Sequence, residues 1–142
     1  MRYPYRKQRT DYYCGPTAVQ MILGAYGVSA TQKQLAGLME TSPTSGTRRR
    51  ALAKPLRAHG MRVHTKIHSS VDEMKRLLRD GWSVIVNYIE TEDDISHFAV
   101  VTAITSSHVV MQDPSHGPNY HLPRREFVSR WRGSHPRAFA RW

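Results

Sequence analysis

The chain has 142 residues, of which 39% are hydrophobic and 9% aromatic, and it carries a formal net charge of +10. This length and apolar content suit a single folded domain over residues 1–142 and exclude wholesale disorder. No apolar run approaches the roughly 20 residues of a membrane helix. The single cysteine excludes an internal disulfide and a cysteine-based zinc cage.

Basic residues outnumber acidic ones, with 21 Lys and Arg against 11 Asp and Glu, and most of the basic residues are Arg. Arginine binds carboxylates and phosphates with a rigid fork of donors. A positive charge of this size favours acidic surfaces or nucleic acid as partners, although it says little about the fold. A non-catalytic binding module for nucleic acid or another acidic partner is therefore one function to test.

The first 13 residues are basic and aromatic, and no apolar stretch among them resembles a secretory signal. A lone thiol in a chain without such a signal fits a reducing compartment. These features predict a cytoplasmic protein with no membrane span.

Apolar spacing predicts mainly helices in the first half of the chain. Gly15-Pro16 opens an apolar stretch at helical spacing, which places Cys14 at the N-terminus of a helix. Ser70 and Glu73 form a capping box for a later helix. The other expected elements are helices at 31–40 and 47–59, the second interrupted by Pro55, and a short strand at 61–67.

Runs of β-branched residues of strand length dominate the second half. The expected strands are 82–89, 98–104, 109–112 and 120–122, followed by a helix at 123–131 and an edge strand at 138–141. Helices first and strands later is the α+β pattern. The core is expected between the first helix and a mostly antiparallel sheet.

Cys14 is the first candidate for chemistry. A lone cysteine is most often a small buried hydrophobe. At a helix N-terminus, however, the dipole and the unpaired backbone N–H groups stabilise a thiolate. Polar Asp11, Tyr12 and Tyr13 precede Cys14, which indicates a surface position, and the two tyrosines are candidates for the wall of a substrate groove.

A thiol nucleophile needs a base, and the base needs a group that orients it. His97 begins one predicted strand and Asp113 closes the next. A tight turn at Ser106 would join the strands in a hairpin and bring the imidazole beside the carboxylate. Each residue alone has an ordinary interpretation, as a strand-edge histidine and as a turn aspartate before Pro114. Together they favour a catalytic pair.

Gln8 is the fourth candidate, six residues before Cys14. Its amide could donate a hydrogen bond to a developing oxyanion, with the Cys14 backbone N–H as the second donor. By spacing alone, an ordinary surface glutamine is the better explanation.

Three of these sequence segments resemble the active-site segments of a known enzyme family. The stretch QRTDYYCGPTA at 8–18 resembles the active-site stretch of the double-glycine leader (bacteriocin-processing) peptidases, a family of papain-like cysteine peptidases. HFAVV at 97–101 and VVMQDP at 109–114 are similar to the His and Asp strands of that family, and 120–131 is similar to its closing segment.

The resemblance implies a papain-like fold and a peptidase that acts on a peptide or protein. It implies Cys14 as nucleophile, His97 as general base, Asp113 as orienter and Gln8 in the oxyanion hole. Nothing in the motifs calls for a cofactor. Hydrolysis of another amide, or acyl transfer through the same thiol, stays open as an alternative chemistry.

Two further patterns have ordinary explanations. Arg48, Arg49 and Arg50 open a predicted helix, where cations oppose the dipole. This suggests an external partner, but a solvated face is the favoured explanation. His64 and His68 have the spacing of metal ligands on a helix, but no third ligand stands out and the segment is predicted to be a strand. No metal site is expected.

Overall fold

The computed structural model describes residues 1–133, and the edge strand expected at 138–141 lies outside that range. The helices are α1 (Cys14–Ala25), α2 (Gln32–Leu38), α3 (Ala53–Ala58), α4 (Val71–Arg79) and α5 (Arg124–Gly133), and a 3-10 turn, η1 (Arg49–Leu52), directly precedes α3. The strands are β1 (Val84–Ile89), β2 (Ser96–Ile104), β3 (His108–Asp113) and β4 (Gly117–Pro123). Every strand expected between residues 82 and 122 is confirmed, with small shifts at the ends. Within the described residues, no helix is long and apolar enough to cross a membrane.

The four strands form one antiparallel sheet in the order β1-β2-β3-β4, so each strand lies beside its neighbour in sequence. Tyr88 of β1 lies opposite His97 of β2. Val100 of β2 lies opposite Gln112 of β3, and the β2–β3 ladder shifts register after Val101. Such a bulge bends the strand and increases its twist.

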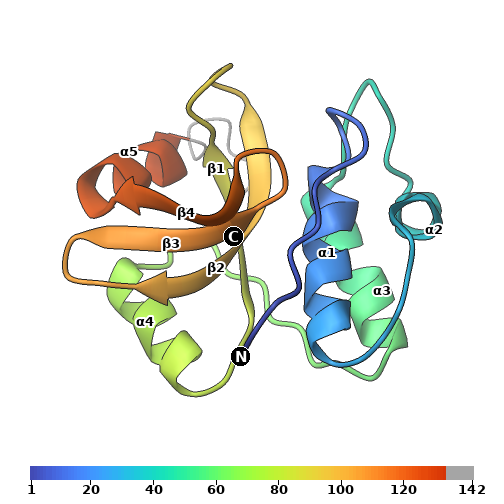
Figure 1. Ribbon diagram of the computed structural model, residues 1–142, viewed down its shortest axis with the longest axis horizontal. Helices are drawn as coiled ribbons and strands as arrows, with labels where there is room; N and C mark the ends of the chain where they lie inside the picture. Colours follow the sequence, from blue (N-terminus) through green and yellow to red (C-terminus); the bar gives the residue numbers. More distant parts are fainter. Residues whose placement is uncertain (134–142) are drawn as a thin grey trace.

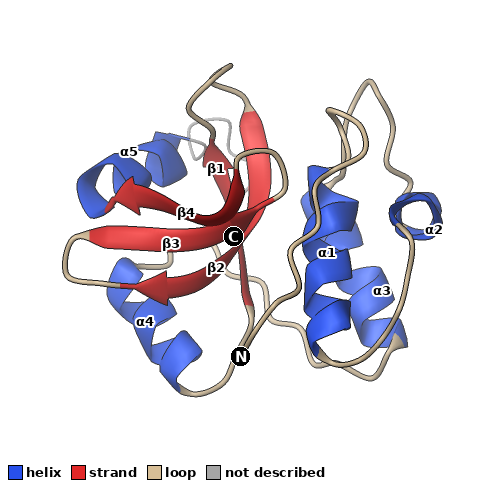
Figure 2. Ribbon diagram, in the orientation of Figure 1, coloured by secondary structure: helices blue, strands red, loops and turns tan. Residues whose placement is uncertain are grey.

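Helices cover both faces of this sheet (Figures 1 and 2). On one face, Phe98 and Val100 of β2 pack into a core shared with α1, α2 and α3. On the other face, Ala99 and Val101 join a core shared with α4 and α5. Alternate residues of β2 therefore serve two cores, because successive side chains of a strand point to opposite faces. The α+β class, with helices packed on an antiparallel sheet, is confirmed.

The strand expected at 61–67 is wrong, because this segment has no regular structure. Met61 and Val63 pack against the α1 core, but residues 64–68 are all exposed. The carbonyl of Val63 accepts a hydrogen bond from the Arg57 side chain, 3.1 Å away, and not from a neighbouring strand. Despite its local alternation of apolar residues, this segment pairs with no described strand.

The helix expected at 47–59 is shorter and divided. It begins as η1 and continues as α3, and Pro55 is the third residue of α3. In the first turn of a helix the missing N–H of proline leaves no intrahelical bond unmade. Pro55 therefore marks the start of the α-helix and not a kink within it.

Candidate active site

The N-terminal segment is fastened along the end of the sheet. The Tyr5 hydroxyl donates to the backbone carbonyl of Asp113 at 2.7 Å. The backbone N–H of Gln8 donates to the carbonyl of Pro114 at 2.9 Å. These two bonds attach Gln8 to the chain immediately after Asp113, although more than a hundred residues separate them in sequence.

Gln32, at the start of α2, holds the same segment from the helical side. Its side-chain Nε2 donates to the carbonyl of Lys7 at 2.9 Å, and its Oε1 accepts from the backbone N–H of Arg9 at 2.9 Å. Gln32 is only 4% exposed, so both ends of one buried amide fix the backbone on either side of Gln8. The Oε1 atom of Gln8 is itself buried and has no hydrogen-bond partner among the described residues.

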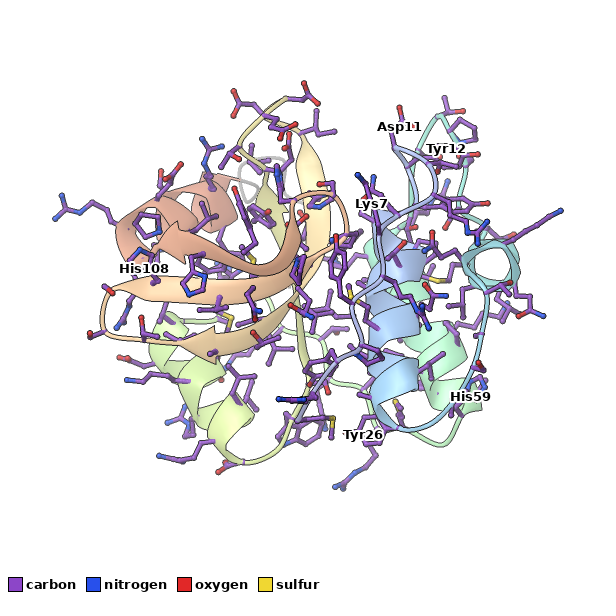
Figure 3. All side chains as sticks on the ribbon, in the orientation of Figure 1. Lys7, Asp11, Tyr12, Tyr26, His59 and His108 are labelled. Carbon is purple, nitrogen blue, oxygen red and sulfur yellow. The ribbon has the colours of Figure 1, made fainter. Side chains whose placement is uncertain are left out.

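Cys14 is the first residue of α1 and is a free, half-buried cysteine. A Cβ atom on Gly15 would lie 2.6 Å from Oγ1 of Thr47, so only glycine lets the loop before η1 pack this closely on the start of α1. The Thr47 hydroxyl is held in turn by a 2.7 Å hydrogen bond with Thr41. This contact fixes the position of the loop relative to the thiol. Figure 3 labels Asp11 and Tyr12 at this end of α1 and Tyr26 at the other.

His97 and Asp113 form a buried pair at the end of the sheet. His97 Nε2 lies 2.8 Å from Asp113 Oδ1, with the two side chains 6% and 0% exposed. The ladder ends at Val100 and Gln112, and one further step would put Asp113 opposite Ala99. The imidazole therefore reaches the carboxylate along a diagonal between strands, a separation that long side chains can span, and not directly across the pair as the hairpin predicted.

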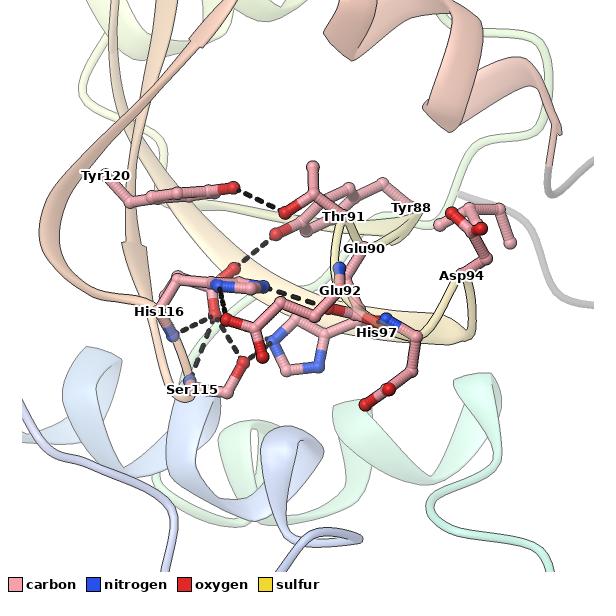
Figure 4. Close-up of polar contacts among 12 residues, drawn as sticks. Tyr88, Glu90, Thr91, Glu92, Asp94, His97, Ser115, His116 and Tyr120 are labelled. Carbon is pink, nitrogen blue, oxygen red and sulfur yellow. Dashed lines mark hydrogen bonds and ion pairs between the residues drawn. The ribbon is translucent and has the colours of Figure 1, made fainter.

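Further donors hold the Asp113 carboxylate (Figure 4). Buried Tyr88 donates its hydroxyl to Oδ2. The backbone N–H groups of Ser115 and His116 both donate to Oδ1 at 3.0 Å. Asp113 is thus a turn aspartate before proline, as its sequence context indicates, and it also holds His97.

Electrostatics favour an ion pair between these two side chains. Burial opposes a charge on either, but the hydrogen bond and charge of His97, with the Tyr88 hydroxyl, lower the pKa of Asp113 to about 2. For His97, burial lowers the pKa, but the hydrogen bond to Asp113 and the interaction with Cys14 outweigh burial and raise the pKa to about 10. Burial and the negative charge of Asp113 raise the pKa of Tyr88, which keeps its hydroxyl protonated and donating.

A second polar cluster braces this pair. Glu90 Oε1 accepts a 3.0 Å hydrogen bond from His116 Nε2. The His116 ring stacks on Tyr120 with ring centroids 4.6 Å apart, and the Tyr120 hydroxyl bonds to Thr91 at 2.9 Å. These contacts tie the β1–β2 loop to the β3–β4 turn (Figure 4). They fix the start of β2, where His97 stands, relative to the end of β3.

A cavity of about 910 Å³ opens beside Cys14. Its walls come from the N-terminal segment, the loop before η1, η1 itself and the ends of β1 and β2. They include Tyr12 but not Tyr13. A second cavity of about 930 Å³ lies around Trp82, away from all four candidate residues. Cys14 therefore faces a space large enough for a short stretch of substrate.

The fold connects the four candidate residues, which are spread over more than a hundred positions in sequence. His97 interacts with both Asp113 and Cys14, and the backbone of Gln8 is bonded to the residue after Asp113. The predicted direct cross-strand contact is replaced by a diagonal one.

Sequence reasoning missed the residues that support the pair. Tyr88 reads as an ordinary apolar member of a strand, and no local pattern indicates that its hydroxyl ends at Asp113. Ser115 and His116 could have been found, since Asp-Pro-Ser is a common turn sequence. Among residues 1–133 no group of three or more metal-ligating side chains gathers, and His64 packs edge-on against Trp82.

Three comparisons relate this chain to known proteins. The model of the Peptidase C39 family matches residues 2–135. An uncharacterized protein of Methanothermobacter thermautotrophicus is 29% identical over 114 residues, which cover 78% of this chain and 70% of the relative. The peptidase domain of Streptococcus ComA, a bifunctional ABC transporter involved in quorum sensing, superposes with a TM-score of 0.75 at 20% identity, covering 93% of this chain and 94% of that one.

A double-glycine-motif protease from an AMS/PCAT transporter, solved in complex with the leader peptide, superposes with a TM-score of 0.76 at 20% identity. The match covers 93% of this chain and 87% of the other. At these identities the two structures establish the likeness of fold, and the papain-like architecture expected from the motifs is confirmed.

Proposed function

We propose that this chain, which belongs to the Peptidase C39 family, is a papain-like cysteine peptidase whose nucleophile is Cys14. One observation carries the proposal: a buried imidazole, His97, is held by a buried carboxylate 2.8 Å away, and the hydrogen bond and charge of the only thiol of the chain help to raise its pKa. Its Nε2 is engaged by Asp113, so Nδ1 is the nitrogen left for the thiol. This arrangement suits a base that is oriented by one neighbour and serves another.

The proposed reaction begins with attack of the Cys14 thiolate on the carbonyl carbon of a peptide bond. The oxyanion that forms accepts hydrogen bonds from the backbone N–H of Cys14 and the side-chain amide of Gln8. His97 gives its proton to the leaving amine as the C–N bond breaks, which leaves an acyl-enzyme. The imidazole then takes a proton from water, the hydroxide cleaves the thioester, and the thiolate returns.

The structure supports particular roles for the surrounding residues. Gln32 holds the backbone on both sides of Gln8, which suits an amide that must be in position before the charge develops. Asp113 and Tyr88 keep the imidazole in one orientation. A peptide as the substrate class is supported by the related protease that was solved with its leader peptide.

A fluorogenic peptide library, with cleavage products identified by mass spectrometry, tests the proposal. We expect Cys14→Ala to abolish cleavage and His97→Gln to reduce it by about 10²–10⁴-fold, the usual contribution of a general acid–base. His121→Gln is the matched control, because His121 is an exposed strand residue whose ring, among the described residues, hydrogen-bonds to the nearby Asn119 carbonyl and contacts the ring of His108.

Alkylation by iodoacetamide gives an independent measurement, since Cys14 is the only thiol. We expect Cys14 to be labelled faster than a free cysteine at pH 6, and this advantage to disappear in His97→Gln. Unchanged hydrolysis in Cys14→Ala, or labelling no faster than that of a free thiol, would exclude a thiol peptidase.

A further inference from the structure

Three consecutive arginines lie in the wall of the cavity that contains Cys14. Arg48, Arg49 and Arg50 all line this space of about 910 Å³. Asp11 is the only acidic residue among its described lining residues. The cavity beside the candidate nucleophile therefore carries a surplus of positive charge.

Local structure explains how the arginines reach the cavity. Ser42 and Gly46 form an isolated β-bridge that closes the loop before η1, and Thr47 packs on the Cβ-less face of Gly15. The arginines follow Thr47 directly, so the same close contact that fixes the start of α1 places them beside Cys14.

Contacts within the described chain leave the charges of Arg48 and Arg50 without an ion-pair partner. Arg48 and Arg50 are exposed, and neither forms an ion pair with a described residue. They stand at the start of η1 and α3, where a cation opposes the peptide dipoles. Arg49 is half-buried and has other interactions. Arg48 and Arg50 thus line the cavity without an ion-pair partner among residues 1–133.

The nearby acidic loop does not cancel this charge. Asp94 pairs with Arg130 at 3.0 Å, and Glu92 lies 3.6 Å from the His116 ring. Neither carboxylate lines the cavity. The cavity wall on that side consists of Asn87, Ile95, Ser96 and Phe98, none of which is charged.

We propose, resting on the proposed function, that the substrate carries acidic side chains close to the scissile bond and that Arg48 and Arg50 bind them. Guanidinium groups form charge-assisted, bidentate hydrogen bonds with carboxylates. The preference is for Asp or Glu over Asn or Gln at the same position, because the amides match the carboxylates in shape but lack the charge.

A pair of small reagents tests the field at Cys14 without knowledge of the substrate. Iodoacetate and iodoacetamide alkylate the same thiol, and they differ in the negative charge of iodoacetate. The ratio of their rates measures the local potential. A unit charge about 10 Å from the thiol, at the dielectric constant of water, changes that ratio by about twofold at low salt. The effect shrinks at 0.5 M salt, where the screening length falls to a few ångströms.

We expect Arg48→Gln and Arg50→Gln each to lower the iodoacetate-to-iodoacetamide ratio by about twofold, and the double variant by about fourfold. Arg125→Gln removes the same charge from an exposed position on α5, on the opposite face of the sheet, and should leave the ratio unchanged. A ratio unaffected in the double variant overturns the proposal.

Peptide substrates give the second measurement. Cleaved library peptides should be enriched in Asp or Glu near the cut, and replacing these residues with Asn or Gln should raise KM more than it lowers kcat. Loss of this preference in the double variant is the expected result, and a preference that survives it refutes the role of the arginines. Slow labelling of Cys14 by both reagents would instead count against the thiol peptidase itself, so the two failures are distinct.

Discussion

Replacing Asp113 with asparagine tests the electrostatic core of the site. The pKa of His97 rises from its ordinary 6.5 to about 10, a difference worth about 5 kcal/mol. A charge 2.8 Å away, in a medium of effective dielectric about 20, supplies about 6 kcal/mol before burial is counted. The charge of Asp113 is therefore strong enough to produce a rise of this size in the pKa of His97. Burial is the largest single influence on His97 and opposes its charge, whereas Cys14 still raises its pKa. Without the charge of Asp113, burial should outweigh the remaining interaction with Cys14, and the pKa of His97 should fall below about 8.

Long-range ¹H–¹⁵N NMR of the imidazole nitrogens at pH 8 reads this directly. In the wild type His97 should be an imidazolium with both nitrogens protonated, and in Asp113→Asn it should be neutral. The His97→Gln spectrum identifies the resonance among the eight histidines. Asp80→Asn is the matched control, since Asp80 is exposed at the end of α4 and should change nothing at His97.

The pH dependence of stability gives a second measurement of the effect of Asp113→Asn, and the direction of the change follows from the pKa of His97. Because the pKa of His97 is raised in the folded protein, its contribution is complete below pH 6.5 and is lost as the pH rises toward 10. Wild-type stability in urea should therefore fall relative to that of Asp113→Asn by up to about 3 kcal/mol between pH 6 and pH 9. A neutral His97 in the wild type at pH 8, or a charged one in the variant, would refute the reasoning.

Two other variants test the packing and the bracing of the site. Gly15→Ala places a Cβ 2.6 Å from Oγ1 of Thr47 and should lower the free energy of unfolding, measured by chemical denaturation, by about 1–3 kcal/mol. Gly37→Ala is the control, since Gly37 lies in an open helical position, and it should be neutral or stabilising. Equal effects of the two substitutions would contradict the close contact. Tyr88→Phe removes a donor to a buried carboxylate and should cost about 2 kcal/mol at pH 7. Because the pKa of Asp113 is lowered to about 2, this cost should diminish as the pH falls below 4; a cost that stays constant from pH 6 to pH 3 would argue against the bond.

Much of the fold follows from local patterns. Helical spacing after Gly15 and the capping Ser70 predict α1 and α4, and the β-branched runs predict all four strands of the described chain. The strand expected at 61–67 is the failure, and it is instructive. A strand needs a paired partner as well as an alternating sequence, and this segment pairs with no described strand.

The candidate site, too, could be predicted from the sequence only in part. Residue chemistry and order were enough to single out Cys14, His97, Asp113 and Gln8 from the sequence. The hydroxyl of Tyr88 at the carboxylate was not predictable, because it depends on the register of β1 against β2 and on the twist that the bulge in β2 introduces.

Apart from 61–67, the sequence by itself indicated which described segments are helical or extended, because those choices depend mostly on neighbours a few residues apart. It also marked the residues able to carry thiol chemistry. Only the tertiary structure decided that His97 meets Asp113 along a diagonal and that Arg48 and Arg50 line the same cavity as the thiol. Those relations join segments tens of residues apart through register, a bulge and the close approach of Thr47 to Gly15, and no local periodicity encodes them.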